Sequence, residues 1–478
     1  MDESLDVNLK KTIKSKVTEE NKQKWIFIFI AIILFLLISV LPTPEGLSQS
    51  GQYALAVFGF TIILWVTRPV SFPMIFFFTA VLLVGTGVLT PENAFQGAGS
   101  STIFFLLGAI ILAFSLSKHH LDKRIALKFL NRFGTKPSSF LFGTVLISAL
   151  LSMMMPAHGV VALLIPIILS VLRATKKEMI GTNFSKAILL SLAYGSSIGS
   201  MGTLLGGARN PLAISIYYQS TGQMVSFLDW FIAAIPIVLI MIFFVYIVIR
   251  YFYPLERIDM KHLQRYLQQE VEKMGSISFG ELKVIFFIIL SFVLWSTFGT
   301  IIGMATVAVF IAGLLGVTNT LNWEDVENKL PWGIIFLYAG AITLAFSLTE
   351  TGASSFIAQT LIDFVAINPY LVIFVVVTLT IFLSEVMSNS AATGTILPIT
   401  LTVFTSLGLS AKTGMYVVAL PSAFALMFII GTPGSAMVYD TGFLRIKDFI
   451  KPGLTLNLIG ITIFMTVGLG WWKIIGLW

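Results

Sequence analysis

Apolar runs of about 20 residues recur along the chain from Lys24 to Trp478, separated by short polar breaks. A helix rises about 1.5 Å per residue, so each run is long enough to cross a hydrocarbon layer of about 30 Å. The first run covers about residues 25–42, and the fourth covers about 101–117. The pattern predicts an all-α protein that crosses a membrane many times.

Composition agrees with this prediction and argues against other classes. Charged residues make up 11% of the 478 residues, whereas soluble chains carry roughly 25%. The basic residues behind the net charge of +7 form short clusters between apolar runs, which favours membrane topology over nucleic-acid binding. With no Cys and four His, we expect neither disulfides nor a transition-metal site. No nucleophile motif, phosphate loop or dinucleotide fingerprint indicates an enzyme or a bound cofactor.

The basic residues also predict the side of each loop, because Lys and Arg accumulate on cytoplasmic loops. Six lysines before the first run place the N-terminus in the cytoplasm, and a cluster after residue 444 places the last connecting loop inside. No signal-peptide cleavage site follows the first run, so we expect it to be retained in the plasma membrane. The two clusters are Lys10, Lys11, Lys14, Lys16, Lys22 and Lys24, and Arg445, Lys447 and Lys451.

One apolar stretch, from Pro137 to Leu172, has cytoplasmic flanks on both sides and therefore enters and returns. Its middle, Met155 to Gly159, contains a proline and a glycine that break helices. Irregular backbone at membrane depth is tolerated only where protein or a water-filled cavity satisfies it. We predict an inner re-entrant hairpin at about 137–173. Its basic flanks are Lys118, Lys123, Arg124, Lys128, Arg132 and Lys136, then Arg173, Lys176, Lys177 and Lys186.

A second hairpin is predicted at about 369–408, entering from the outside. No basic residue occurs between Lys329 and Lys412, and two apolar halves flank Ser388-Asn389-Ser390. In addition to the two opposed hairpins, we expect about 11 transmembrane helices in two inverted repeats. The predicted divisions are a cytoplasmic polar N-terminus (1–24), helix 1 with the first repeat (25–250), a cytoplasmic or interfacial connector (251–283) and the second repeat (284–478).

An internal repeat links the two hairpins. Pro156-Ala157-His158 aligns with Ser388-Asn389-Ser390, and each tip lies ten residues before Pro166 or Pro398. A second matching pair, Gly202 to Asn210 and Gly431 to Ser435, also interrupts apolar spans. Broken segments at matching positions of inverted halves predict a substrate site at the midplane. Half-helix N-termini expose free N–H groups, which suit a carboxylate or sulfate.

With these motifs in hand, the chain resembles the divalent anion/sodium symporter family of the ion transporter superfamily, which carries dicarboxylates, citrate and sulfate. The resemblance covers nearly the whole length after residue 24. It implies a homodimer whose protomers have a scaffold and a transport part that moves the site by an elevator-like shift. Its most specific residues are Ser388-Asn389-Ser390 with Pro398, Leu420-Pro421, Gly431-Thr432-Pro433, Phe443-Leu444-Arg445-Ile446 and Leu456-Asn457-Leu458-Ile459-Gly460.

The resemblance also implies cation sites. A second sodium site matches at Ser384, Ser388, Asn389 and the Gly431 carbonyl, whereas a first site keeps only Ser152 and Gly206. The chain departs from the family at Pro156-Ala157-His158, where a first Ser-Asn-Thr is expected, and at Ala208-Arg209-Asn210, where a Pro-Pro-Asn turn is expected. The expected substrate-binding residues are Ser388, Asn389, Ser390, His158, Arg209, Asn210, Thr432 and Pro433.

Several roles stay open from the sequence. Arg209 supplies a fixed positive charge for the substrate, or it pairs permanently with Glu385 or Asp440. His158 takes part in proton coupling or makes a backbone hydrogen bond, and Glu385 accepts a proton or pairs with Arg209. We therefore expect a secondary carrier of di- or tricarboxylates that is coupled to sodium, to protons or to a counter-anion. The alternatives are a sodium-independent carrier of sulfate or another anion, then a channel or a membrane enzyme.

Overall fold

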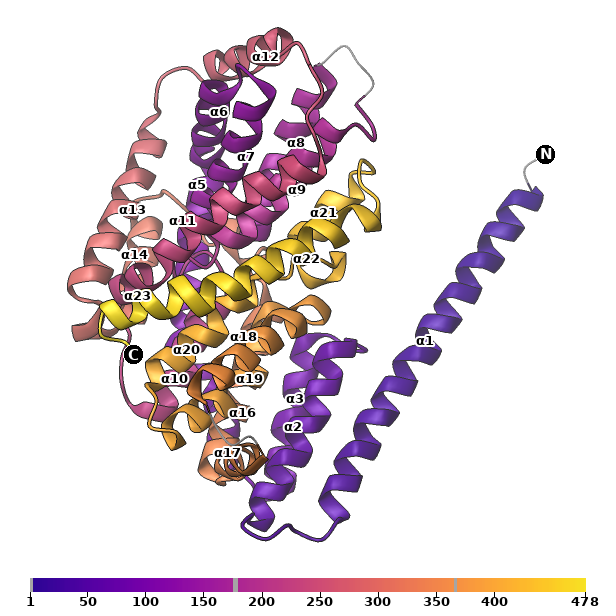
Figure 1. Ribbon diagram of the computed structural model, residues 1–478, viewed down its shortest axis with the longest axis vertical. Coiled ribbons are helices and arrows are strands. Elements are labelled where there is room, and N and C mark those ends of the chain that lie inside the picture. Colours follow the sequence, from indigo (N-terminus) through magenta and orange to yellow (C-terminus); the bar gives the residue numbers. More distant parts are fainter. Residues whose placement is uncertain (1–2, 175–178, 365–367) are drawn as a thin grey trace. The chain divides into compact units, whose positions relative to one another are not determined.

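The computed structural model describes the backbone of residues 3–174, 179–364 and 368–478, and the side chains of 22–173, 179–360 and 368–478. The side chains of the first four lysines, Lys10 to Lys16, and all of Lys176 and Lys177 fall outside these ranges. Every regular element of the described chain is a helix (Figure 1). The chain forms two compact units, Met1–Ala98 with Trp332–Ile357, and Gly99–Pro331 with Ala358–Trp478.

The first unit is a small helical bundle. Helix α1 begins at Glu3, so the polar N-terminal residues and the first apolar run form one continuous helix. Within this unit α16 packs against α2, α3 and α4, and the buried Thr343 hydroxyl donates to the Ala94 carbonyl (3.1 Å). The elements of the unit are α1 (Glu3–Val40), α2 (Gln49–Thr67), α3 (Phe72–Gly85), α4 (Pro91–Gln96) and α16 (Trp332–Glu350).

The second unit contains both hairpins. Two short 3₁₀ turns and two π-helical turns interrupt its helices, and one further helix, α17 (Ala353–Phe364), crosses the division between the units. The elements are α5 (Ser101–Lys118), α6 (Leu121–Phe133), α7 (Pro137–Ser152), α8 (Ala157–Ala174), α9 (Asn183–Gly199), α10 (Arg209–Thr221), α11 (Phe227–Phe252), α12 (Lys261–Lys273), α13 (Phe279–Thr297), η2 (Gly299–Gly303), α14 (Met304–Val317), α15 (Glu324–Glu327), α18 (Pro369–Val386), α19 (Asn389–Ser406), α20 (Ala411–Ala419), η3 (Pro421–Ala423), η4 (Ile429–Gly431), α21 (Pro433–Asp440), α22 (Ile446–Ile463), η5 (Phe464–Gly468) and α23 (Leu469–Ile474).

By length and composition, nine helical stretches of the described chain are able to cross a membrane. They include α18, which forms only half of the outer hairpin, whereas α3 is shorter and α9–α10 and α20–α21 are broken. The expected total of about 11 crossings is consistent with these nine once the short and broken elements are considered. The prediction of an all-α protein with many spans is confirmed.

Both hairpins form where helix-breaking residues predicted them. Helices α7 and α8 join at Met153 to Pro156, and α18 and α19 join at Met387 and Ser388. The inner hairpin thus covers 137–174 and the outer hairpin 369–406, within two residues of the predicted bounds. Figure 1 shows the two hairpins in the second unit, α7–α8 in purple and α18–α19 in orange.

Each hairpin packs against the broken helix of the other half of the chain. Helix α8 contacts α21, and α19 contacts α10. Each hairpin also packs on the broken element that follows it, α7 and α8 on α9, and α18 and α19 on α20. A methyl at Gly434 of α21 would lie 3.1 Å from the Val161 side chain of α8. Each half thus contributes a hairpin and a broken helix to the packing of the other half.

The close packing of helix α7 against helix α9 depends on glycine. A β-carbon at Gly199 would lie 2.2 Å from the Ala149 carbonyl oxygen, which is far inside van der Waals contact. We expect Gly199→Ala to destabilise the protein by about 1–3 kcal/mol, because the backbones must move apart. Thermal unfolding of purified protein measures this. Gly313→Ala is the control, since nothing lies within 4 Å of that position in α14, and its melting temperature should not fall.

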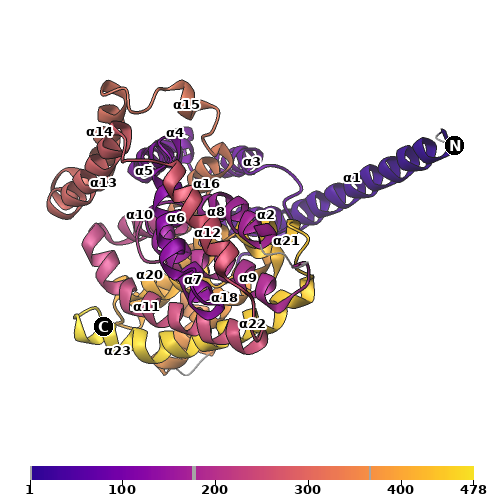
Figure 2. The ribbon, with the colours of Figure 1, turned by 90° about the horizontal axis from the view of Figure 1, so that it is seen from above.

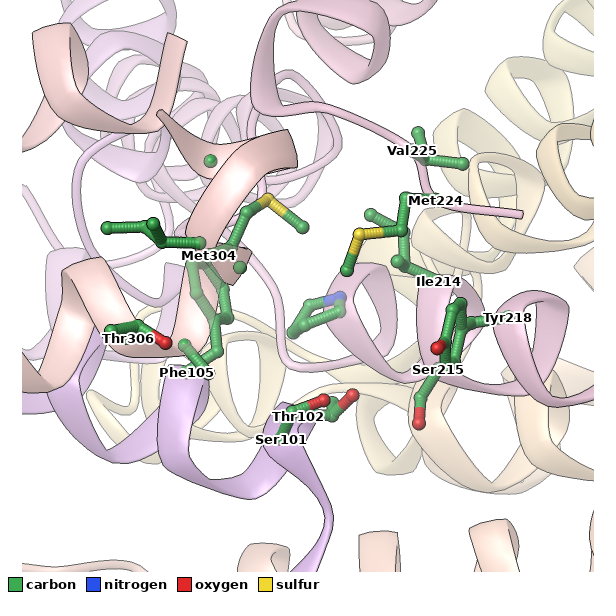
Figure 3. Close-up of a pocket in the computed structure, with 15 residues that line it drawn as sticks. Ser101, Thr102, Phe105, Ile214, Ser215, Tyr218, Met224, Val225, Met304 and Thr306 are labelled. Carbon is green, nitrogen blue, oxygen red and sulfur yellow. The ribbon is translucent and has the colours of Figure 1, made fainter. Parts of the chain in front are cut away.

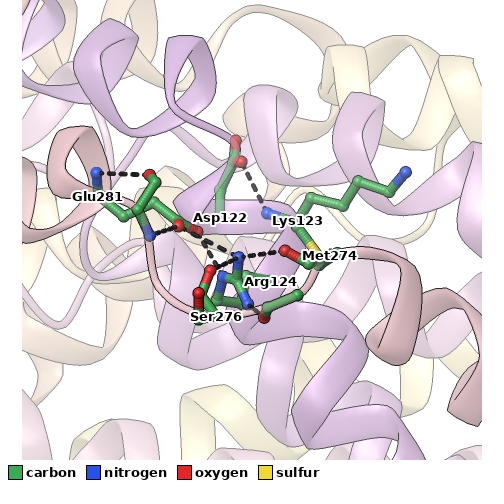
Figure 4. Close-up of polar contacts among 8 residues, drawn as sticks. Asp122, Lys123, Arg124, Met274, Ser276 and Glu281 are labelled. Atoms are coloured by element: carbon green, nitrogen blue, oxygen red, sulfur yellow. Dashed lines mark hydrogen bonds and ion pairs between the residues drawn. The ribbon is translucent and has the colours of Figure 1, made fainter.

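Arg124 is one of the residues that tie the connector between the halves to the bundle. Arg124 of α6 pairs with Glu281 and donates to the carbonyls of Met274, Gly275 and Ser276 (2.9, 2.8 and 3.1 Å; Figure 4). The apolar face of α12 packs on α6 and α8, so this part of the connector covers protein. Figure 2 shows α11 and α22, which also pack together, along one edge of this unit.

Candidate functional site

Four helices of the second unit begin at a break in a hairpin or in a broken span. These are α8, α10, α19 and α21. Ser388 caps α19 by accepting from Ala391 N (3.2 Å), and Thr432 caps α21 by accepting from Ser435 N (3.1 Å). Ser388 and Thr432 therefore act as helix caps, and a helix start leaves further N–H groups without partners inside the helix. Such helix starts favour an anion.

The outer tip carries buried oxygens that have no hydrogen-bond partner in the described part of the chain. They are Ser384 Oγ and Asn389 Oδ1. Ser390, next to Asn389, is 9% exposed. A methyl at Gly431 would lie 3.2 Å from the Ser384 carbonyl oxygen, so the broken helix runs directly against the hairpin end. Buried acceptors without donors fit a bound cation, because a cation satisfies oxygens that no N–H reaches.

Glu385 is buried beside these oxygens and faces main-chain donors. Its carboxylate accepts from Leu426 N (2.9 Å), Met427 N (2.7 Å) and Phe428 N (2.8 Å), and from Asn457 Nδ2 (2.6 Å). These donors satisfy both carboxylate oxygens, so the geometry supplies a neutral amide cradle in place of the guanidinium partner that we had considered. Nests of successive N–H groups bind anions in this way.

Arg209 begins α10 and is 4% exposed. Its Nη2 donates to Ser200 Oγ (2.9 Å), and its Nε donates to the Ala419 carbonyl at the end of α20 (3.3 Å). Ser422 Oγ donates to the same carbonyl (2.8 Å) and accepts from the Thr393 hydroxyl of α19 (3.2 Å). Arg209 is thus joined through neutral oxygens to the outer hairpin, and its positive charge lies between the two broken helices.

Asn210 is fully buried next to Arg209. Its Nδ2 donates to the carbonyls of Ser200 (2.8 Å) and Thr203 (2.6 Å), which closes the turn before α10. Its Oδ1 has no partner among the described residues, and neither does the buried Ser152 Oγ. The Ser152 carbonyl would lie 2.2 Å from a methyl at Gly206. Glycine is therefore required at Gly206. Of the expected first sodium site, Ser152 Oγ has no donor in the described chain, and the Asn210 oxygen was not expected to be a member.

The tip of the inner hairpin has the same break between two half-helices as the outer tip, but it lacks the Ser-Asn-Thr signature of the family. The first N–H of α8, from Ala157, donates to the Gly206 carbonyl (3.2 Å), so the hairpin tip docks on the broken helix. His158 is half-buried in the first turn of α8. Pro433, the first residue of α21, and Asp440, the last, are exposed. Of the acids weighed as partners of Arg209, Glu385 faces the amide cradle and Asp440 is exposed.

Some residues of this region were not predicted. Ser200 and Thr203 hold Arg209 and Asn210, and Asn457 completes the cradle of Glu385. Asn457 lies in an apolar span. Because a polar residue is costly in lipid, its position there could have indicated a buried polar contact. Ser200 and Thr203 are short polar residues beside glycines, and nothing in their local pattern distinguishes them from residues of an ordinary turn.

A cavity of about 170 Å³ lies along one face of α10, apart from the predicted site residues (Figure 3). Pro211, Ile214, Ser215 and Tyr218 line it from α10, and Phe105 and Met304 lie opposite. The lining is mainly apolar and includes no charged side chain. A small dicarboxylate needs charged or directed polar groups, so this cavity is a poor candidate for the anion site.

Comparisons with known proteins agree with this geometry. The family described as "Sodium:sulfate symporter transmembrane region" matches residues 22–478. A protein of Staphylococcus saprophyticus named sodium-dependent dicarboxylate transporter SdcS is 29% identical over 463 residues, covering 91% of this chain and 89% of its own. The protein of that name from Staphylococcus aureus is 29% identical over 462 residues, covering 91% and 88%.

A solved structure shares the fold at low identity. The Alcanivorax borkumensis YdaH transporter superimposes with a TM-score of 0.55 and 14% identity, covering 83% of this chain and 89% of its own. This likeness concerns the fold alone. The family match, by contrast, spans every described helix from the first membrane crossing to the last. The chain therefore belongs to the sodium:sulfate symporter transmembrane family.

Proposed function

We propose that this protein is a sodium-coupled secondary transporter of small dicarboxylates, with its anion site among the four helix starts of the second unit. The observation that carries the proposal is the outer tip. There, the family signature Ser388-Asn389-Ser390 begins a half-helix, and the buried oxygens of Ser384 and Asn389 lack donors among the described residues. A helix start that favours an anion beside oxygens that favour a cation suits coupled transport.

The anion would be bound by directed donors and by one fixed charge. Asn389, Ser390 and Thr432 lie at or next to the starts of α19 and α21, where free N–H groups add to the side chains. Arg209 adds a guanidinium at the start of α10. Ser388, Asn210, His158 and Pro433 complete the set of proposed substrate-binding residues. The proposed transport cycle needs no resident cofactor.

The cation would be held by oxygens on the same tip. Ser384, Ser388, Asn389 and the Gly431 carbonyl form the proposed second sodium site, and Gly431 packs against Ser384. Ser152 and Gly206 form the proposed remnant of a first site, with the free oxygen of Asn210 as a third member. Sodium is a transported ion here, so both sites serve to bind it together with the anion and release it on the other side.

The finer features of the carrier rest on its family and its charge pattern. We propose a homodimer in the plasma membrane, with the N-terminus in the cytoplasm and an elevator-like movement of the transport part. The Lys and Arg clusters support the orientation. The packing of α8 on α21 and of α19 on α10 supports a transport part built from both halves.

Uptake into proteoliposomes tests the function. Purified protein in empty vesicles should accumulate radiolabelled succinate or malate only when an inward sodium gradient is imposed, and uptake should saturate. Potassium in place of sodium is the control. Vesicles preloaded with dicarboxylate separate the alternatives. If loaded vesicles take up as much dicarboxylate without sodium as with it, the protein is an exchanger. If vesicles take up sulfate but no dicarboxylate, sulfate is the substrate. Either result contradicts the proposal.

A further inference from the structure

We propose that Glu385 is a positioning residue for the outer cation site, fixing the unwound segment 424–431 against the hairpin end. This inference rests on the proposed function and assigns a role to a carboxylate that the sequence left open between proton transfer and ion pairing. It concerns the arrangement of the site and requires no contact of Glu385 with sodium or with the anion.

Glu385 joins three elements that are far apart in the sequence. It lies one residue before the end of α18, and its carboxylate binds three successive main-chain N–H groups from Leu426 to Phe428. The fourth donor, Asn457 Nδ2, belongs to α22. The same segment lies against α22, because a methyl at Gly453 would lie 2.4 Å from the Leu426 carbonyl oxygen. One side chain therefore ties the hairpin, the unwound segment and α22 together.

The cradle suits the ionised carboxylate. All four neighbours donate, and the deprotonated form is the one that only accepts. Hydrogen bonds to a charged acceptor are roughly twice as strong as neutral ones, and inside a protein each is strengthened further. Protonation of Glu385 would remove the charge that strengthens all four bonds. The arrangement thus favours a structural role for this carboxylate over a role as a proton carrier.

The segment held by Glu385 leads directly into the cation site. It runs on from Phe428 through η4 to Gly431, whose β-carbon position is 3.2 Å from the Ser384 carbonyl and 3.4 Å from the Glu385 carbonyl. Ser384, which precedes Glu385, carries the hydroxyl oxygen that has no partner among the described residues. If the cradle is lost, Gly431 is free to move relative to Ser384 and Asn389. The oxygens of the site then no longer converge, and sodium affinity falls.

Glu385→Gln tests this role in proteoliposomes. The amide keeps the shape of the side chain but turns one acceptor into a donor facing other donors. We expect the sodium concentration for half-maximal succinate uptake to rise about tenfold or more, which corresponds to about 1.4 kcal/mol. The KM for succinate measured at saturating sodium should change much less. Asn457→Ala, which removes one of four donors, should give a smaller shift in the same direction.

Glu256→Gln is the matched control. Glu256 also binds successive main-chain N–H groups, those of Asn183 and Phe184 (2.7 and 2.8 Å), but at the start of α9, away from the tips. It should leave half-saturation by sodium unchanged. In detergent, sodium should raise the melting temperature of the wild type, and Glu385→Gln should need more sodium for the same rise. This second measurement remains possible if the variant does not transport.

The outcomes separate this inference from the function on which it rests. If wild-type vesicles show no sodium-dependent uptake, the proposed function fails. If the wild type transports with sodium and Glu385→Gln shows an unchanged sodium requirement, only the positioning role is overturned. A fall in maximal rate with unchanged half-saturation, or a shift of equal size in Glu256→Gln, would indicate a general structural effect and also overturns it.

Discussion

Replacing Asn389 by alanine should reduce sodium-dependent dicarboxylate uptake by about 100-fold or more. The substitution removes a buried oxygen without a partner in the described chain, and it removes a donor at the start of α19. A hydrogen bond to a charged group contributes about 1.5–3 kcal/mol, and the lost cation oxygen adds to this. Because the same residue serves both ions, we expect the sodium requirement and the KM for succinate to rise together.

The control for this prediction is Asn368→Ala. Asn368 caps the other half of the same hairpin, α18, by accepting from Tyr370 N (3.0 Å), and it is exposed. Its loss should cost about 1 kcal/mol of stability and leave sodium-dependent uptake largely intact. If Asn389→Ala folds and transports at the wild-type rate with unchanged half-saturation by sodium, Asn389 binds neither ion.

The second large effect is expected at Arg209. Arg209→Ala should weaken succinate binding roughly 10- to 100-fold, the equivalent of about 1.5–3 kcal/mol for a lost bond to a charged group. Arg209→Lys should restore little, because the guanidinium bonds Ser200 and Ala419 from two different nitrogens and an ammonium is a single point charge. Isothermal titration of purified protein with succinate at saturating sodium measures the affinity directly.

An exposed control arginine and the melting temperature of each variant distinguish substrate binding by Arg209 from a structural role. Arg250→Ala removes an exposed arginine that donates to the Tyr246 hydroxyl (2.8 Å), and it should bind succinate like the wild type. If Arg209→Ala lowers the melting temperature but binds succinate with unchanged affinity, the charge is structural. A loss of affinity together with a normal melting temperature supports the substrate role.

The hairpins were predictable because their signals are local. Pro156 and Gly159, or Ser388 and Asn389, interrupt apolar runs whose flanking charges predict that each run returns to its starting side. The structure ends each hairpin within two residues of the predicted bound. The roles of Ser384, Asn389 and Arg209 in binding stay predictions, although the structure places two of these three residues at helix starts and the third on the hairpin end beside them.

By itself, the sequence determined that this chain is an all-α membrane protein with two opposed hairpins and the signature of a symporter family. Spacing, helix breakers and charge act over a few residues, so they can be read along the chain. Only the tertiary structure decided which protein groups the buried polar side chains contact. The donors to Glu385 lie 41, 42, 43 and 72 residues away, and Ala419 lies 210 residues from Arg209. No local pattern specifies such partners, because these contacts arise only when segments far apart in the sequence pack against one another.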